Sequence, residues 1–148
     1  MVAKVALISL AAAALIGASP ALPDSKTFTV PLSAAAQVSS LQAIGLAGDS
    51  DASGLVELTV DPGSRRICYD FSVARLATPL MAHIHKGSAE GIGPSVVTLF
   101  TGPGGDLSDC LTWTEKWLTE IVANPSEFYV NLYTTEYPEG ALRGQLDG

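Results

Sequence analysis

The two histidines of the sequence, His83 and His85, are the residues whose spacing most directly suggests chemistry. One residue separates them, and on a β-strand residues two apart face the same side. Both imidazoles can then approach one ion, and imidazole nitrogen is a ligand for zinc and for copper. The pair is therefore a candidate metal site, provided that the rest of the chain supplies further ligands.

Tyr133 is the candidate for a third ligand. It lies in the run 128–134, whose alternating apolar residues are expected to face inward, so that Tyr133 faces outward. If this run pairs with the histidine strand, the three side chains form one polar cluster beneath the loop 87–93. Two interpretations stay open. In the first, His83, His85 and Tyr133 bind copper or another metal weakly, and no other cofactor is expected. In the second, the histidines donate hydrogen bonds to loop carbonyls. We favour the second, because metal sites normally use three or four strong ligands.

Cys68 and Cys110 are the only cysteines of the chain. In an exported protein, an even number of cysteines indicates a disulfide bond. We expect Cys68 and Cys110 to form one, outside the main core, and to tie down the loop 101–115. Free thiols or metal ligands are the alternative, but the spacing lacks the C-x-x-C pattern that such sites often have.

Asp70, Arg143 and Gln145 form a candidate polar cluster. Arg143 and Gln145 are two apart on the last expected strand, so they share a face. Arg143 is expected to pair with Asp70 in a structural ion pair, and the alternative is that its guanidinium binds an anionic ligand.

The motifs of common enzyme classes are absent from the sequence. There is no G-x-S-x-G, no H-E-x-x-H and no phosphate-binding loop. The 15 acidic residues outnumber the 8 basic ones, which argues against nucleic acid as a partner. We therefore expect a non-enzymatic domain that binds an unknown protein or surface ligand, or has a structural role, and an enzyme of another type stays open.

The N-terminal segment has the three parts of a secretory signal peptide. Lys4 gives the first residues a positive charge, residues 5–18 are mostly apolar, and small residues, Ser19 and Ala21, precede the expected cleavage point. The apolar run is too short for a comfortable membrane span, which needs about 20 residues. We expect residues 1–21 to be removed and residues 22–148 to form one domain in the periplasm or outside the cell, with no membrane contact after cleavage. An uncleaved anchor is the alternative.

Alternation of apolar and polar residues predicts an all-β fold. Residues 115–123 instead show helical spacing, and Asn124 and Pro125 should end that helix. The expected strands are 27–32, 56–60, 67–73, 80–85, 96–100, 128–134 and 142–146. We expect an antiparallel, Greek-key-like β-sandwich or barrel of about seven to eight strands with one short helix. Its core should hold Phe28, Val30, Val56, Leu58, Val60, Tyr69, Phe71, Val73, Ile84, Leu99, Val130, Leu132 and Leu142.

The order of several short motifs resembles the CHRD domain, of the type found in exported bacterial proteins. The matching segments are F-T-V-P-L-S at 28–33, G-L-V-E-L at 54–58, C-Y-D-F-S-V at 68–73, A-H-I-H-K-G at 82–87, G-P-S-V-V-T-L at 93–99, Y-V-N-L-Y-T at 129–134 and Y-P-E-G-A-L-R-G-Q-L at 137–146. The resemblance implies an all-β exported domain whose function is largely uncharacterised. Such domains usually carry histidine where this chain has Tyr133, which weakens the metal interpretation. In chordin-like proteins the domain accompanies growth-factor binding, but this chain lacks their cysteine-rich modules, so that partner is not expected here.

The His-x-His segment is also similar to the copper-binding strand of copper/zinc superoxide dismutase. In that arrangement the middle residue enters the core and both histidines face outward beneath a loop. A full copper/zinc site needs several more histidines, and this sequence has only two. Superoxide chemistry of that type is therefore excluded by counting.

Overall fold

The computed structural model describes residues 21–39 and 47–147, so the predicted signal peptide lies almost wholly outside the described residues. Within these ranges, eight strands form one antiparallel sheet in the order β5-β4-β7-β8-β1-β2-β3-β6. The strands are β1 (Lys26–Ser33), β2 (Ser53–Asp61), β3 (Arg66–Ala74), β4 (Pro79–Lys86), β5 (Ser95–Thr101), β6 (Ser108–Thr112), β7 (Phe128–Thr134) and β8 (Leu142–Gln145). The predicted fold class, an antiparallel sandwich or barrel with one short helix, is confirmed.

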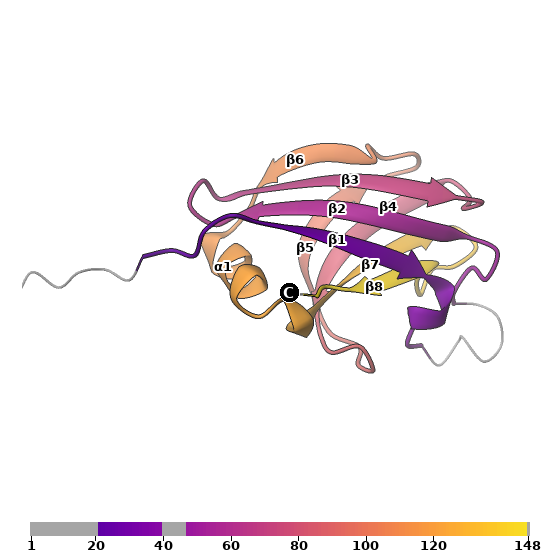
Figure 1. Ribbon diagram of the computed structural model, residues 1–148. Coiled ribbons are helices and arrows are strands. Elements are labelled where there is room, and N and C mark those ends of the chain that lie inside the picture. The colour runs from indigo at the N-terminus through magenta and orange to yellow at the C-terminus, as the bar shows by residue number, and fades with distance from the viewer. Residues whose placement is uncertain (1–20, 40–46, 148) are drawn as a thin grey trace, which may run out of the picture.

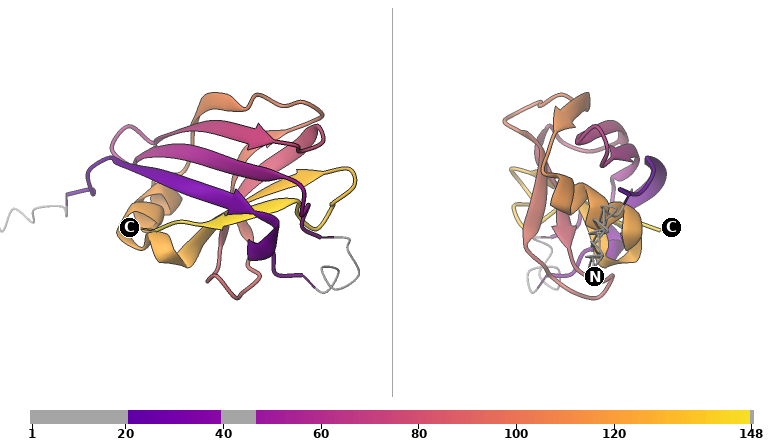
Figure 2. Two further views of the ribbon diagram at one scale, coloured as in Figure 1. Left: turned by 45° about the vertical axis from the view of Figure 1, so that its right-hand side comes forward. Right: turned by 90° about the vertical axis from the view of Figure 1, so that its left-hand side faces the viewer.

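The sheet curls into two halves that face each other (Figures 1 and 2). One half holds β1, β2, β3 and β6, and the other holds β4, β5, β7 and β8. The halves are joined through β1 and β8, where Ser33 pairs with Arg143. Closure is incomplete at the opposite boundary, between the edge strands β5 and β6, which we call the seam.

Two side chains bridge the seam in place of backbone pairing. The Tyr69 hydroxyl donates to the Leu99 carbonyl at 3.2 Å, and the Trp113 indole Nε1 donates to the Val96 carbonyl at 2.8 Å. Both acceptors lie on β5, so these bonds satisfy carbonyls that an edge strand would otherwise leave unpaired. The seam is therefore closed by side chains from β3 and from the residue after β6.

Strand β6 was not predicted from the sequence, which treated residues 101–115 as a loop. Its segment, Ser108–Thr112, has little apolar alternation, and its residues are exposed or half-buried. It forms a strand because it pairs along β3, with Cys68 directly opposite Cys110. The tertiary partner, rather than local propensity, determines this strand.

The interior of the barrel contains the predicted apolar residues with one exception. Val73 is only half-buried and packs at the edge of the core, because β3 is nearing its end there. The predicted core left out several fully buried residues, namely Ile67, Ala82, Val97, Leu118, Ile121, Phe128, Ala141 and Leu146. The other predicted core residues are buried as expected, from Phe28 on β1 to Leu142 on β8.

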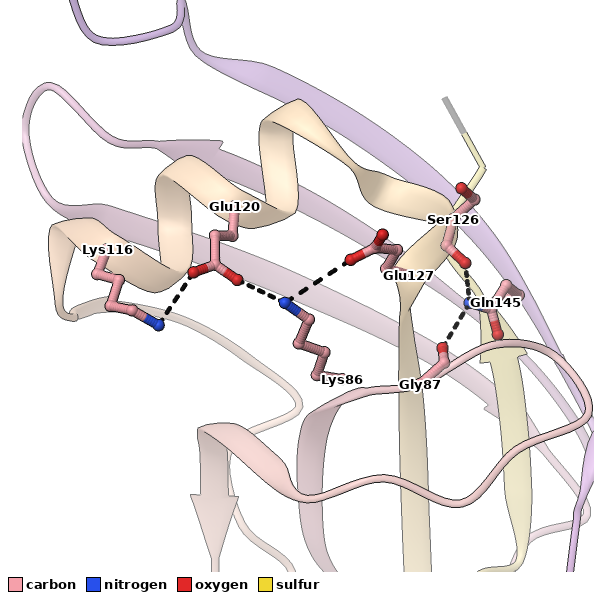
Figure 3. A network of polar contacts seen from close by, with 7 residues as sticks. All are labelled: Lys86, Gly87, Lys116, Glu120, Ser126, Glu127 and Gln145. Atoms are coloured by element: carbon pink, nitrogen blue, oxygen red, sulfur yellow. Dashed lines mark hydrogen bonds and ion pairs between the residues drawn. The ribbon is translucent and has the colours of Figure 1, made fainter.

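The one α-helix among the described residues, α1 (Glu115–Ala123), has the predicted bounds and lies across one end of the barrel (Figure 1). Its Leu118 and Ile121 are fully buried, which explains the helical spacing of its apolar residues. Lys86 of β4 fixes the helix by an ion pair with Glu120 at 2.8 Å (Figure 3). The described residues also include two short 3-10 helices, η1 (Ala34–Ala36) after β1 and η3 (Pro125–Glu127) after α1. No helix of the described residues is long and apolar enough to cross a membrane.

Candidate functional site

The pairing of β4 with β7 brings the predicted candidate residues together. In this register Met81 lies opposite Tyr133 and His85 lies opposite Tyr129. The ring centroids of His83 and His85 are 5.8 Å apart, and those of His83 and Tyr133 are 5.5 Å apart. Ile84 is fully buried, as alternation requires for the residue between the histidines. The condition set from the sequence, that the two strands be neighbours, is therefore met.

Both ring nitrogens of His85 are engaged in hydrogen bonds. Nδ1 lies 2.9 Å from the Gly93 carbonyl oxygen, and Nε2 lies 2.8 Å from the Tyr133 hydroxyl. A carbonyl oxygen can only accept, so Nδ1 must carry the proton of a neutral imidazole. Nε2 then accepts the proton of the Tyr133 hydroxyl. In this tautomer the Nε2 lone pair, through which His85 would bind a metal ion, already accepts the hydrogen bond from Tyr133.

His83 differs from His85 in its contacts. Among the hydrogen bonds of the described residues none involves His83, which is half-buried beside the rings of His85 and Tyr133. Across residues 21–39 and 47–147, no three His, Cys, Asp or Glu side chains gather closely enough to hold a metal ion. Of the three candidate ligands, Tyr133 is the one that could join His83 and His85 around a metal ion. The ion would have to break the hydrogen bond between the Tyr133 hydroxyl and His85 Nε2.

The loop 87–93 is held by side chains from three strands. His85 donates to Gly93, while the Gln145 amide donates to the Gly87 carbonyl at 3.0 Å and to the Ser126 carbonyl at 2.7 Å (Figure 3). The backbone N–H of Gly93 also donates to the Tyr129 hydroxyl at 3.2 Å. A Cβ atom at Gly93 would collide with the Lys86 carbonyl oxygen, so only glycine fits at that position. The loop is therefore fixed over the outward face of β4, β7 and β8.

The predicted ion pair between Arg143 and Asp70 is wrong. Asp70 is exposed on β3, and β1 and β2 lie between that strand and β8. The guanidinium of Arg143 instead lies over the Tyr129 ring, with Cζ 3.5 Å from the ring centroid, and donates to the Ser88 carbonyl at 2.7 Å. The sequence correctly placed Arg143 and Gln145 on one face, but it could not show which strands would flank that face.

Tyr129 is the residue that joins the two parts of this face. His85 stacks on its ring with centroids 4.9 Å apart and an interplanar angle of 6°. Arg143 reaches the same ring from β8, on the other side of β7. An electron-rich ring attracts a guanidinium, so the stack stabilises the buried charge.

A recess opens beside this stack, with a volume of about 230 Å³. Its polar lining consists of Gln37, His85, Asn131, Tyr133, Glu139 and Arg143. Its apolar lining consists of Val38, Ile92, Pro138 and the Tyr129 ring. The recess therefore combines a few polar groups with apolar walls, as small-molecule sites do.

The pKa values of Tyr133, His85 and His83 are all shifted toward the neutral form of the side chain. Burial raises the pKa of Tyr133 to about 12. Burial also lowers the pKa of His85, and the nearby charge of Arg143 lowers it further, while the bond to the Gly93 carbonyl opposes the shift. The pKa of His83 is lowered by burial and by His85. Both histidines and Tyr133 are therefore neutral near pH 7.

The sequence missed two buried residues of this site, Gln37 and Asn131. They are 4% and 5% exposed, and the Gln37 Nε2 donates to the Asn131 Oδ1 at 2.7 Å. Alternation in β7 does place Asn131 on the face of Tyr129 and Tyr133, which was a usable signal. Gln37 follows η1 in a segment without periodicity, so nothing local indicates its role.

We expect the histidines to make the protein less stable in acid. Their folded pKa values lie below the unfolded value of about 6.5, so the unfolded state binds more protons as the pH falls past that value. The contribution of the two neutral histidines to the free energy of unfolding is then fully present above about pH 6.5. It is lost as the pH falls through their folded pKa values. Denaturant melts at pH 7.5 and pH 5.5, in chelator, should give a lower free energy of unfolding at pH 5.5.

His85→Ala should lower the free energy of unfolding at pH 7.5 by about 1–3 kcal/mol, because the Gly93 carbonyl and the Tyr133 hydroxyl lose their partner. His83→Ala is the matched control on the same strand face. The sequence makes both histidines candidates for bonds to the loop, and the structure shows such a bond for His85 and none for His83 among the described residues. Equal losses in the two variants would contradict the role assigned to the loop bond.

The comparison with protein families gives one match. A family model described as the CHRD domain matches residues 28–146, which run from β1 to the residue after β8. No curated protein and no solved structure matches the chain. The match covers all but the first two residues of the sheet, including the histidine strand and the loop above it, and on this ground the chain belongs to the CHRD domain family.

Proposed function

We propose that this protein is exported and acts as a non-enzymatic binding module, with the recess as its ligand site. Family membership supports a binding or structural domain in general. The observation that carries the proposal is that the recess is preformed: half of its lining residues lie on the paired strands β4, β7 and β8, and Ile92 lines it from the loop 87–93, which is held by His85, Tyr129 and Gln145. A site that needs no ordering on binding loses less entropy when its ligand arrives.

Filling the recess tests this proposal. Val38 lines the recess and is half-buried, so Val38→Trp should occupy the space that a ligand would take. Leu55→Trp is the matched control, because Leu55 is 37% exposed on β2, away from the recess. We expect a thermal-shift panel of small acids, amides, sugars and amino acids to include compounds that stabilise the parent and the control but not Val38→Trp. A panel without such a compound would contradict the proposal.

Export has a separate test. The signal-like segment and the Cys68–Cys110 disulfide are both compatible with an oxidising compartment. We expect protein recovered from its native host to begin at about Leu22, following the small residues Ser19 and Ala21. N-terminal sequencing that reads Met1 would contradict cleavage.

Copper binding by His83, His85 and Tyr133 is a second candidate, supported by the convergence of their three rings. Copper(II) is the divalent ion that such a set would hold best. Because the Tyr133 proton occupies Nε2 of His85, binding should be weak. Titration with copper should give no more than weak binding, lost in His83→Ala and His85→Ala, and no stoichiometric zinc. Tight metal binding, with no change in stability of either variant in chelator, would overturn the structural role that we favour for the histidines.

A further inference from the structure

Arg143 is a buried cation without an acidic partner. It is 2% exposed, and the one hydrogen bond of its guanidinium within the described residues is the bond to the Ser88 carbonyl. The ion pairs of the described residues belong to Lys86 and Lys116, and none involves Arg143. A guanidinium has five N–H donors, so most of them remain available. The Tyr129 ring offsets only part of the cost of burying an unpaired charge.

Two side chains of the recess, Arg143 and Asn131, keep donor protons that the hydrogen bonds of the described residues do not use, whereas the Glu139 carboxylate is an acceptor at the same site. The Tyr133 proton goes to His85, and the Asn131 Oδ1 accepts from Gln37. The Asn131 NH₂ group has two protons, of which one faces the Tyr133 hydroxyl. The second proton of that group and the free N–H groups of Arg143 then remain for a ligand. Donors of this kind suit a carboxylate, since Arg and carboxylate form charge-assisted, planar hydrogen bonds.

The size and walls of the recess limit what can carry that carboxylate. A volume of about 230 Å³ is below the roughly 300–1,000 Å³ of common ligand pockets. Val38, Ile92 and Pro138 provide an apolar wall, and Ile92 is 72% exposed at its rim. A short hydrocarbon chain fits against such a wall, whereas a polymer or a nucleotide is too large.

We propose that the recess binds a small monocarboxylic acid, with the carboxylate on Arg143 and a short apolar chain against Val38, Ile92 and Pro138. This inference rests on the recess being the ligand site of the protein. It adds the chemical class of the ligand and names Arg143 as its anchor.

Two acidic side chains near the recess work against an anion. Glu139 lines the recess, and the charge of Glu90 acts on Arg143. A negatively charged carboxylate near the recess repels a bound anion and weakens its affinity, and salt screens this repulsion. Removal of the Glu139 charge should therefore tighten the binding of an acid, which gives a test that leaves the buried arginine in place.

The test is titration calorimetry of the purified protein with butyrate and with butyramide, its uncharged analogue of nearly the same shape. The parent should bind butyrate and not butyramide. Glu139→Gln should bind butyrate roughly threefold to tenfold more tightly. Glu136→Gln is the matched control, because Glu136 is exposed and precedes the same turn but does not line the recess. Arg143→Lys, which keeps the charge but loses the planar fork, should lose most of the affinity.

The outcomes separate the ligand class from the site. Equal binding of butyrate and butyramide, no binding of butyrate by Glu139→Gln, or equal affinities in Glu139→Gln and Glu136→Gln would each overturn the proposal. Glu139→Gln keeps the test valid if Arg143→Lys fails to fold. If butyrate does not bind the parent, but an uncharged compound binds the parent and does not bind Val38→Trp, the ligand class is wrong and the proposed function stands. If butyrate binds the parent and Val38→Trp equally, the recess is not the site.

Discussion

Replacement of Phe71 by alanine is expected to lower the free energy of unfolding by about 3–5 kcal/mol. Phe71 is 5% exposed on β3, and its ring meets Phe100 of β5 edge to face with centroids 6.0 Å apart. A second edge contact joins it to Tyr69 at 5.7 Å. The substitution thus leaves a cavity and also removes an aromatic contact that links the two sides of the seam. A loss of this size is a large part of the roughly 5–15 kcal/mol that stabilises a domain.

Denaturant melts of the parent and Phe71→Ala give this difference directly. Leu55→Ala is a suitable control, because Leu55 is a large apolar residue that lies on the outward face of β2 and is 37% exposed. The control should lose less than about 1 kcal/mol, as surface substitutions usually do. A comparably small loss in Phe71→Ala would mean that the seam closes without this aromatic cluster.

The strands with alternating residues were predictable because one face of each is buried. In β2, Val56, Leu58 and Val60 are each fully buried, and the residues between them are not. Alternation sets which residues face inward whatever the neighbouring strand is. The helix α1 was predictable for the same kind of reason, since its apolar spacing follows a single buried stripe.

The neighbours of each strand were not predictable from such patterns. Alternation placed Arg143 on an outward face but did not show that Tyr129 and the loop 87–93 would cover it. Asp70 was assigned to the same cluster because it was a plausible acidic partner, yet two strands separate it from Arg143. Pairings between segments far apart in the sequence decide such contacts, and a single sequence holds little information on them.

The candidate site was predictable in part. The shared face of His83 and His85, and the outward direction of Tyr133, follow from alternation alone. The bond between Tyr133 and His85 additionally requires β4 to lie beside β7, and alternation alone does not determine that pairing. The recess itself depends on Gln37 and Val38, which reach it from the end of η1 and have no sequence pattern.

Loss of the disulfide bond should have an effect of similar size to the core truncation. Cys68 and Cys110 are bonded to each other, and no cysteine of the described residues is free. Their sequence separation of 42 gives about 4 kcal/mol by the chain-entropy account, as an upper value. The bond joins directly opposite residues of β3 and β6. Its position outside the core was predicted, and the strand β6 was not. We therefore expect Cys68→Ser/Cys110→Ser to lower the free energy of unfolding by up to about 4 kcal/mol.

The location of the disulfide bond predicts which part of the sheet its loss destabilises most. β6 is a five-residue edge strand with a single partner, β3, and its residues are exposed or half-buried. Without the bond it has little apolar burial to hold it, and it leads directly to Trp113, whose indole bridges the seam to Val96. Hydrogen exchange in the double variant should therefore speed up in residues 108–113 more than in β7, which lies inside the sheet.

Chemically reduced parent protein should behave like the variant, and thiol titration of the unreduced, denatured parent should find no free thiol. Uniform exchange changes across the sheet would mean that β6 is held by pairing with β3 and that the disulfide acts only on the unfolded chain.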